Sequence, residues 1–198
     1  MATLTSELNA VNTMLGYIAE SPVNSIADTT ALPPSAALAK GILDEVSREV
    51  QQEGWHFNTA KDYKLTANSS NEIVLPDNVL QVDSVDNQHD VVQRGTKLFN
   101  RKDYTTTFTI DEIKVDITFL LEFIELPEQA RRYITLKASR MFSNRIVGSR
   151  EIEALIYRDE IMAKSAMEEA EGTNSDRTIF DNYDTASRIG INRRTDLA

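Results

Sequence analysis

The chain has 198 residues, of which 41% are hydrophobic and 26% charged, and its 31 acidic and 21 basic side chains give a formal net charge of -10. This composition is typical of a globular protein with a sizeable core. Cysteine is absent, which excludes disulfides, thiolate metal sites and cysteine nucleophiles. The acidic balance argues against wrapping duplex DNA, because phosphate neutralisation needs clustered lysine and arginine. No apolar run approaches the roughly 20 residues that a membrane span needs, so we expect no membrane insertion.

The first part of the chain predicts two helices. Residues 4–19 have an amphipathic pattern, capped by Thr3 or Thr5, in which the apolar positions are Leu4, Leu8, Val11, Leu15 and Ile18. A connection rich in proline, serine and threonine follows. A second helix is expected to begin near Pro34, since proline suits a first helical turn. Gly54 stands where a left-handed C-terminal cap would end that helix.

The period changes between Trp55 and Ile124, where short apolar runs are separated by turn-forming residues, as in an antiparallel sheet. The clearest strand alternates strictly, with Lys114, Asp116 and Thr118 opposite the apolar face formed by Ile113, Val115, Ile117, Phe119 and Leu121. Such alternation predicts one buried and one wet face. The other expected strands are YKLTA, EIVL, VLQVDSV and TKLFN, at residues 63–67, 72–75, 79–85 and 96–100.

Helical signals return after the predicted sheet. A third helix is expected from Pro127 to Gly148, and a fourth from its cap Ser149 to about Glu171. The third segment holds one acid and five bases, and the fourth holds seven acids and three bases. These opposite charges predict an antiparallel hairpin with complementary surfaces. Exposed ion pairs contribute only about 0–1 kcal/mol each, so we expect them to select the pairing more than to stabilise it.

The last 27 residues contain scattered hydrophobes without a sustained period, and alone they predict a flexible tail. Arg193 and Arg194 are adjacent guanidiniums that can capture carboxylates on a partner, with a solvated tail as the alternative. The residues expected to dock are Ile179, Phe180, Tyr183, Ile189, Ile191, Arg193 and Arg194.

Together these elements predict an α+β fold: an α-helical bundle formed by the N- and C-terminal helices, with a mostly antiparallel β insertion between them. The expected parts are the first helices of the bundle, the β domain, the helical hairpin and the docking tail, at residues 1–54, 55–126, 127–171 and 172–198. The β part would then protrude from a helical body whose two halves are distant in sequence.

The sequence offers little catalytic chemistry. Its seven glycines are too far apart for a phosphate-binding loop, and we expect no cofactor and no metal. Glu53 and Asp62 have the spacing of the Glu/Asp pair in phage-type lysozymes, but Asn68 stands where that motif has threonine. With 31 acids in the chain, such a pair arises easily by chance. A hydrolase that uses these two carboxylates stays the alternative to a non-enzymatic protein.

The basic segment in the third expected helix and the two histidines are further candidates for functional residues. The segment RRYITLKASR places four bases on a helix, but they are interleaved with core residues. Pairing with the acidic fourth helix therefore explains them better than a nucleic-acid patch does. Of the two histidines, His56 is expected to be a structural neighbour of Trp55 and Phe57, and His89 to lie in a turn.

Three stretches carry a family resemblance: LNAVNTMLGYIAESPVNSI, VSREVQQEGWHFN and ELPEQARRYITLKASRMFSNRIVGSREIE, at residues 8–26, 46–58 and 125–153. Together they resemble the tail tubular protein A family of short-tailed, podovirus-type bacteriophages. The resemblance covers about sixty residues in both helical segments, in the same order and at compatible spacing. The β region and the tail match only loosely.

The resemblance implies a structural virion protein, made in the host cytoplasm and located in the phage tail. Twelve copies would form a ring that connects the portal protein to the tail nozzle protein, tail tubular protein B, with tail fibres as further candidate partners. The genome would leave through the ring without sequence-specific binding. The C-terminal segment would become ordered by wrapping a neighbour or entering the portal ring. The alternative is the same tail protein with an added polysaccharide- or peptidoglycan-hydrolysing activity.

Overall fold

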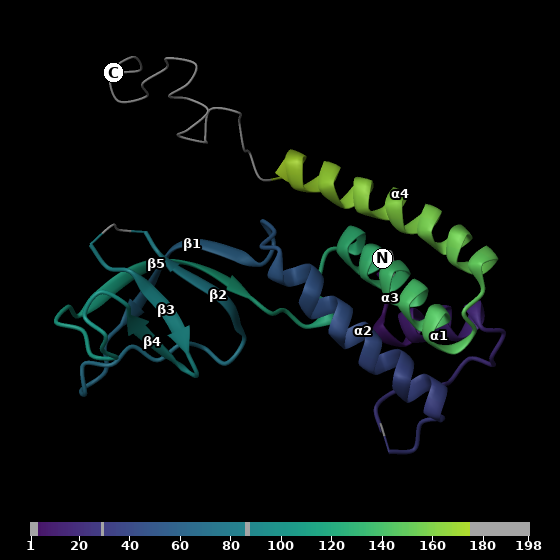
Figure 1. Cartoon of the computed structure of the whole chain (residues 1–198), viewed down its shortest axis with the longest axis horizontal. Coiled ribbons are helices and arrows are strands. Elements are labelled where there is room, and N and C mark those ends of the chain that lie inside the picture. The colour runs from purple at the N-terminus through teal and green to yellow at the C-terminus, as the bar shows by residue number, and fades with distance from the viewer. Residues whose placement is uncertain (1–3, 29, 86–87, 175–198) are drawn as a thin grey trace, which may run out of the picture.

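The computed structural model describes residues 4–28, 30–85 and 88–174. It has the predicted α+β architecture, in which helices from the two ends of the chain pack together and antiparallel strands are inserted between them (Figure 1). The helices are α1 (Glu7–Tyr17), α2 (Pro34–Gln52), η1 (Phe123–Glu125), α3 (Glu128–Ile146) and α4 (Arg150–Asn174). The strands are β1 (Thr59–Thr66), β2 (Val79–Ser84), β3 (Val91–Arg94), β4 (Lys97–Asn100) and β5 (Glu112–Phe119).

Helix α1 begins at Ser6, whose hydroxyl accepts a hydrogen bond from the Asn9 N–H at 3.1 Å. The prediction of Thr5 as the cap is therefore wrong, and Thr3 lies outside the described residues. Thr5 instead donates two hydrogen bonds to the Glu128 carboxylate: one from its backbone N–H, at 2.9 Å, and one from its hydroxyl. Since Glu128 stands in the first turn of α3, where a carboxylate complements the helix dipole, this contact fixes the start of α1 to the start of α3.

Helix α2 begins at Pro34, as predicted, where the missing N–H has no intrahelical partner to lose. Gly54 follows the helix with a φ of 76°, which confirms the predicted left-handed ending. The next residue, Trp55, turns back onto the helix, and its indole N–H donates to the Val50 carbonyl at 2.7 Å. The chain therefore leaves α2 in a fixed direction toward the strands.

The β part consists of a three-stranded antiparallel sheet, in the order β1-β5-β2, and a two-stranded hairpin of β3 and β4. The predicted alternation in the central strand β5 is confirmed at the buried residues Ile113, Val115 and Ile117. Thr118 departs from it. This residue is buried instead of wet, because β1 begins beside it and its hydroxyl lies 3.4 Å from that of Thr59.

The strands differ from the prediction in two places. The expected strand at residues 72–75 is wrong, because these residues form only isolated bridges, through Glu72 and Val74. Strand β3 was not predicted, and it forms a hairpin with β4 around Gly95, a residue with a φ of 61°. Strands of four residues are too short for a period of two to stand out.

The helical part and the β part each have their own buried apolar cluster. The helical cluster is built from α1, α2 and α3, with Trp55 and two residues of α4, and its fully buried side chains include Met14, Leu15, Ile42, Leu43, Ile134 and Phe142. The β cluster lies between the sheet and the hairpin and includes Ile73, Leu98, Ile113 and Ile117.

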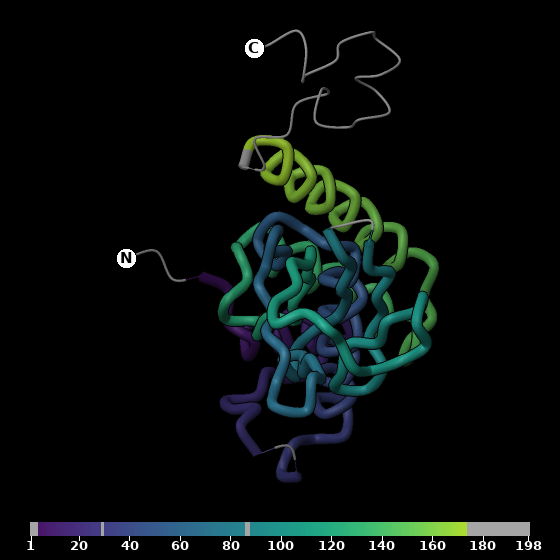
Figure 2. Tube along the Cα trace, turned by 90° about the vertical axis from the view of Figure 1, so that its left-hand side faces the viewer, coloured from purple at the N-terminus to yellow at the C-terminus, as the bar shows by residue number. Residues whose placement is uncertain are grey.

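Helices α3 and α4 form the predicted hairpin, which turns at Gly148 with a φ of 65°. Ser149 caps α4 as expected, accepting from the Ile152 N–H at 3.4 Å. In both views α4 lies on the outside of the molecule, with α3 beneath it (Figures 1 and 2). Most of its described residues are exposed.

The predicted charge complementarity between α3 and α4 is correct in part. Arg140 of α3 pairs with Glu160 of α4 at 2.5 Å. Two other bases of α3 pair with α2 instead: Lys137 with Glu49 at 3.1 Å, and Arg145 with Glu45 at 3.4 Å. The bases of α3 thus connect it to the helices on both of its sides.

Candidate assembly site at the junction of helices and sheet

The chain crosses between the helices and the sheet twice, at residues 51–58 and 119–131, and these two crossings form the junction. The side-chain amide of Gln51 forms two hydrogen bonds with the backbone of the second crossing. It accepts from the Leu121 N–H at 2.8 Å and donates to the Leu121 carbonyl at 3.0 Å. Asn58 donates to the carbonyls of Gln51 and Phe119, both at 2.9 Å. Because Gln51 and Asn58 are buried and their bonds satisfied, they hold the crossings in one geometry.

Arg131 is the second element of the junction, and it is 4% exposed. Its guanidinium donates to three carbonyls: Leu126 at 2.7 Å, Thr5 at 2.9 Å, and Ile124. No carboxylate is among these partners, so Arg131 acts as a planar multiple donor and not as half of an ion pair. It joins the start of the chain, the second crossing and α3.

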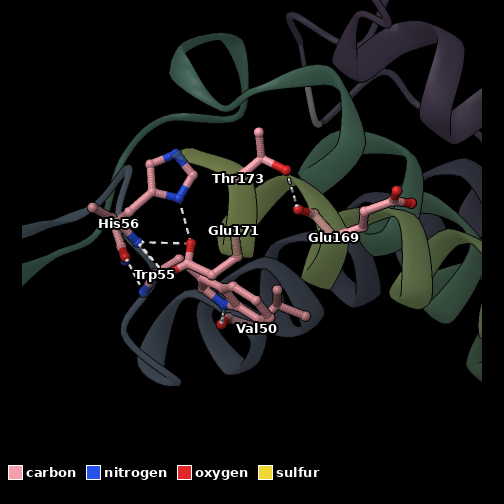
Figure 3. A network of polar contacts seen from close by, with 7 residues as sticks. Val50, Trp55, His56, Glu169, Glu171 and Thr173 are labelled. Atoms are coloured by element: carbon pink, nitrogen blue, oxygen red, sulfur yellow. Dashed lines mark hydrogen bonds and ion pairs between the residues drawn. The ribbon is translucent and has the colours of Figure 1, made fainter. Parts of the chain in front are cut away.

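The third element is the pair of His56 and Glu171, shown in Figure 3. The Glu171 carboxylate accepts from the His56 backbone N–H, at 3.0 Å from Oε2, and the ring Nδ1 of His56 contacts the same oxygen. Phe57 stands edge-on to the imidazole, with 5.7 Å between ring centroids. This contact, the His56–Glu171 clamp, fixes the last turns of α4 against the junction.

The clamp gives the rest of the chain a defined starting point. Helix α4 ends at Asn174, three residues after the clamp. The seven predicted docking residues, from Ile179 to Arg194, lie outside the described residues. The described end of α4 therefore lies beside the junction, at one end of the helical part (Figure 1).

A groove of about 1,210 Å³ opens on the other side of the second crossing. We call it the α1–α2 groove, because its walls come from the start of α1, one face of α2 and residues 120–124. Its apolar lining includes Leu4, Leu8, Ile26, Leu43, Phe123 and Ile124. The volume exceeds the roughly 300–1,000 Å³ of small-molecule pockets.

Glu53 and Asp62 do not form a catalytic arrangement in the structure. Glu53 is the C-cap of α2, and Asp62 lies in a bulge of β1 with a φ of 54°. Both are exposed, and neither lines the α1–α2 groove. In a glycosidase, burial raises the pKa of the general acid, and the second carboxylate lies in the same cleft. The geometry therefore gives the hydrolase alternative no support.

The part of the chain that the structure describes contains no group of three or more side chains able to hold a metal ion. Among its helices, none combines the length and the apolar character needed to cross a membrane.

Sequence reasoning placed His56 beside Phe57 correctly but missed the partner Glu171, as well as the roles of Arg131 and Gln51. A hydrogen bond between positions 115 residues apart leaves no local pattern. One signal was available for Arg131: a base at a position where the helix periodicity expects a core residue, one residue after Ala130.

Comparison with known families supplies the remaining evidence. The family model of the tail tubular protein matches residues 8–177, which includes the β part as well as the helices. A comparison with curated proteins gave no match. The match confirms the resemblance inferred from the three helical stretches: the chain belongs to the tail tubular protein family.

Proposed function

We propose that this chain is the ring-forming adaptor that connects the portal to the nozzle of a short-tailed phage and forms part of the channel through which DNA is ejected. Family membership makes it a structural protein of a phage tail. The adaptor role is what the resemblance to tail tubular protein A implies, and it requires no catalytic group or cofactor.

The His56–Glu171 clamp is the observation that carries this proposal furthest. An adaptor must hold a partner on each side in a fixed orientation. The clamp fixes the end of α4 to the junction, so the last 24 residues, 175–198, start from one place in the molecule. A segment with spaced apolar residues that starts from a fixed point loses less freedom on docking than one that starts from a moving helix. We assign this segment to the portal side.

The acidic charge of the chain fits a channel. Twelve copies, each with a formal charge of -10, create a negative field that repels the DNA phosphates. Such a wall lets DNA slide, whereas a wall of lysine and arginine would hold it. An electron-microscopy reconstruction of the ring whose lumen is lined mainly by lysine and arginine would contradict this part of the proposal.

Deletion of residues 175–198 tests the portal contact, because it leaves α4 and its clamp whole. We expect the shortened protein to fold with an unchanged melting temperature but to lose binding to purified portal rings, measured by co-sedimentation and by electron microscopy of the mixture. A second variant, the full chain with Arg193→Ala and Arg194→Ala, keeps the apolar residues of the tail and should weaken portal binding less than the deletion does. Unchanged portal binding by the shortened protein would overturn the assignment of the tail.

A further inference from the structure

We infer that neighbouring copies join head to tail, with an exposed ridge of α4 from one copy seated in the α1–α2 groove of the next. The α4 ridge consists of Leu155, Met162 and Ala166. The inference rests on the proposed function, because a ring built from identical chains requires each copy to offer two different and complementary surfaces.

The α4 ridge is a second apolar face on a helix that already has a buried one. Ile156 and Met167 are buried on the side that packs against α3. Leu155 and Met162, by contrast, are 68% and 63% exposed, and Ala166 is exposed as well. Residues spaced by seven and four positions share one side of a helix. Arg158 and Asp159 stand between Leu155 and Met162 and are exposed too, so the ridge joins apolar ends to a charged middle. Large apolar side chains exposed together on an outer helix are typical of a surface that another polypeptide covers.

The α1–α2 groove has matching properties. Leu4 and Ile124 line it, yet they are 51% and 73% exposed. The ridge of the same copy cannot fill it, because α4 packs along α3 while the groove walls come from α1, α2 and residues 120–124. Each copy therefore carries one convex and one concave apolar surface without a cover among the described residues.

The charges at the edges of the two surfaces are reciprocal. Arg158 stands beside the ridge and Arg48 lines the groove, and neither has an ion pair within the described part of the chain. Each arginine has a carboxylate near it: Asp159 next to Arg158 on α4, and Asp44 in the groove. Asp44 pairs with Lys40, but this lysine also pairs with a second carboxylate, that of Glu7. Seating one surface in the other lets each arginine meet a carboxylate of the next copy, which favours this pairing over wrong ones.

A pairing of two ridges around a two-fold axis is the main competing arrangement. It would leave the groove uncovered and would close at a dimer, since a two-fold interface uses the same patch on both copies. The ridge is about 17 Å long, from the 1.5 Å rise per residue of an α-helix, and it suits a long open groove better than a compact pocket.

Cross-linking can test the pairing directly, because the chain has no cysteine of its own. The variant with both Met162→Cys and Ile124→Cys, treated with a short bifunctional maleimide under conditions in which the protein oligomerises, should give a ladder of linked chains. Each variant with only one of the two cysteines should give no cross-linked chains. The matched control combines Ile124→Cys with Lys164→Cys, on the opposite side of α4, and should give no ladder.

The other outcomes assign the groove differently. Linked dimers from Met162→Cys alone would establish the two-fold pairing and overturn the inference. A ladder that is absent from the full chain and appears only on deletion of residues 175–198 would assign the groove to the tail and overturn it too. Oligomers without any ridge-to-groove link would also overturn it but leave the proposed ring intact. A protein that forms no oligomer either alone or with portal would overturn both.

A second experiment uses blocked surfaces. Met162→Glu blocks the ridge and Ile124→Glu blocks the groove, and both positions are exposed, so the melting temperature should not change. Each variant alone should lose at least about tenfold in self-association, which corresponds to about 1.4 kcal/mol. An equal mixture retains one intact ridge and one intact groove, so it should form dimers and nothing larger. Full-size rings from either single variant would contradict the inference.

Discussion

Glu171 holds the last turns of α4 to the junction through its side chain. Its side chain is 16% exposed, and its carboxylate accepts from the backbone N–H of His56 and contacts the imidazole. Hydrogen bonds to a charged group contribute about 1.5–3 kcal/mol when they are partly shielded from water. The clamp is thus large enough to order the last turns of α4 but small compared with the core beneath them.

We expect Glu171→Gln to loosen the end of α4 without unfolding the protein. The amide oxygen can still accept from the His56 N–H, but the negative charge beside the imidazole is lost. Amide hydrogen exchange of residues 168–174 should become at least about fivefold faster, which corresponds to about 1 kcal/mol of local stability, while the helical core keeps its protection.

Glu169→Gln is the matched control for that exchange measurement. Glu169 lies on the same turn but is exposed, and its backbone carbonyl, which accepts from Thr173 at 2.9 Å, is not changed by the substitution. If Glu169→Gln and Glu171→Gln had the same effect on exchange, the loss of helix charge and not the clamp would explain both.

Residues whose role depends on the local backbone were predictable, and residues whose role depends on distant partners were not. Gly54 and Gly148 both take the positive φ expected at a helix end, because that requirement is set by the neighbouring residues alone. Arg131 and Glu171 hold the structure through contacts with segments more than 100 positions away. For such residues, amino-acid type and spacing carry no information about the partner.

The same distinction applies to whole elements. Strand β5 was predictable because its alternation continues long enough to stand out, yet Thr118 broke the pattern where β1 starts over it. Helix α4 was predictable as a helix, but not the division of its apolar residues between a buried face and the exposed Leu155 and Met162. Which face of a helix is covered depends on the elements that pack on it.

The contact between α1 and α2 has a charged component that depends on pH. Lys40 of α2 binds Glu7 of α1 at 2.8 Å and Asp44 of its own helix at 3.2 Å. Burial alone would lower the pKa of Lys40, but the hydrogen bond and charge of Glu7, together with the charge of Asp44, outweigh it and raise this pKa above its ordinary value of 10.5.

A lysine pKa that is raised in the folded state gives stability that is fully present below pH 10.5 and is lost as the pH rises through the raised value. We therefore expect the melting temperature to fall as the pH is increased above this range. Lys40→Met should make that fall shallower, because the variant has no ammonium to lose. Lys114→Met, at an exposed position of β5, is the control and should leave the slope unchanged. An equal slope for wild type and Lys40→Met would contradict the role given to this lysine.

At the scale of the whole molecule, the question is whether the helical and β cores unfold separately. Each has its own buried cluster, and the two clusters share no residue. The junction joins them, however, through the satisfied buried side chains of Gln51 and Asn58 and through Arg131. Unfolding the sheet alone would remove the partners of Gln51 and Asn58 and leave buried polar groups unpaired, at a cost of about 1–3 kcal/mol for each group.

We therefore expect one cooperative transition, whichever core is weakened. Ile117→Ala in the β core and Phe142→Ala in the helical core each remove a fully buried side chain, at a cost of about 2–5 kcal/mol. In differential scanning calorimetry, each variant should melt in a single peak at a lower temperature, with equal calorimetric and van't Hoff enthalpies. Gln51→Ala combined with Ile117→Ala should split that peak, because it removes the bonds through which unfolding of the sheet destabilises the helices. Two peaks already in Ile117→Ala alone would show that the junction does not couple the cores.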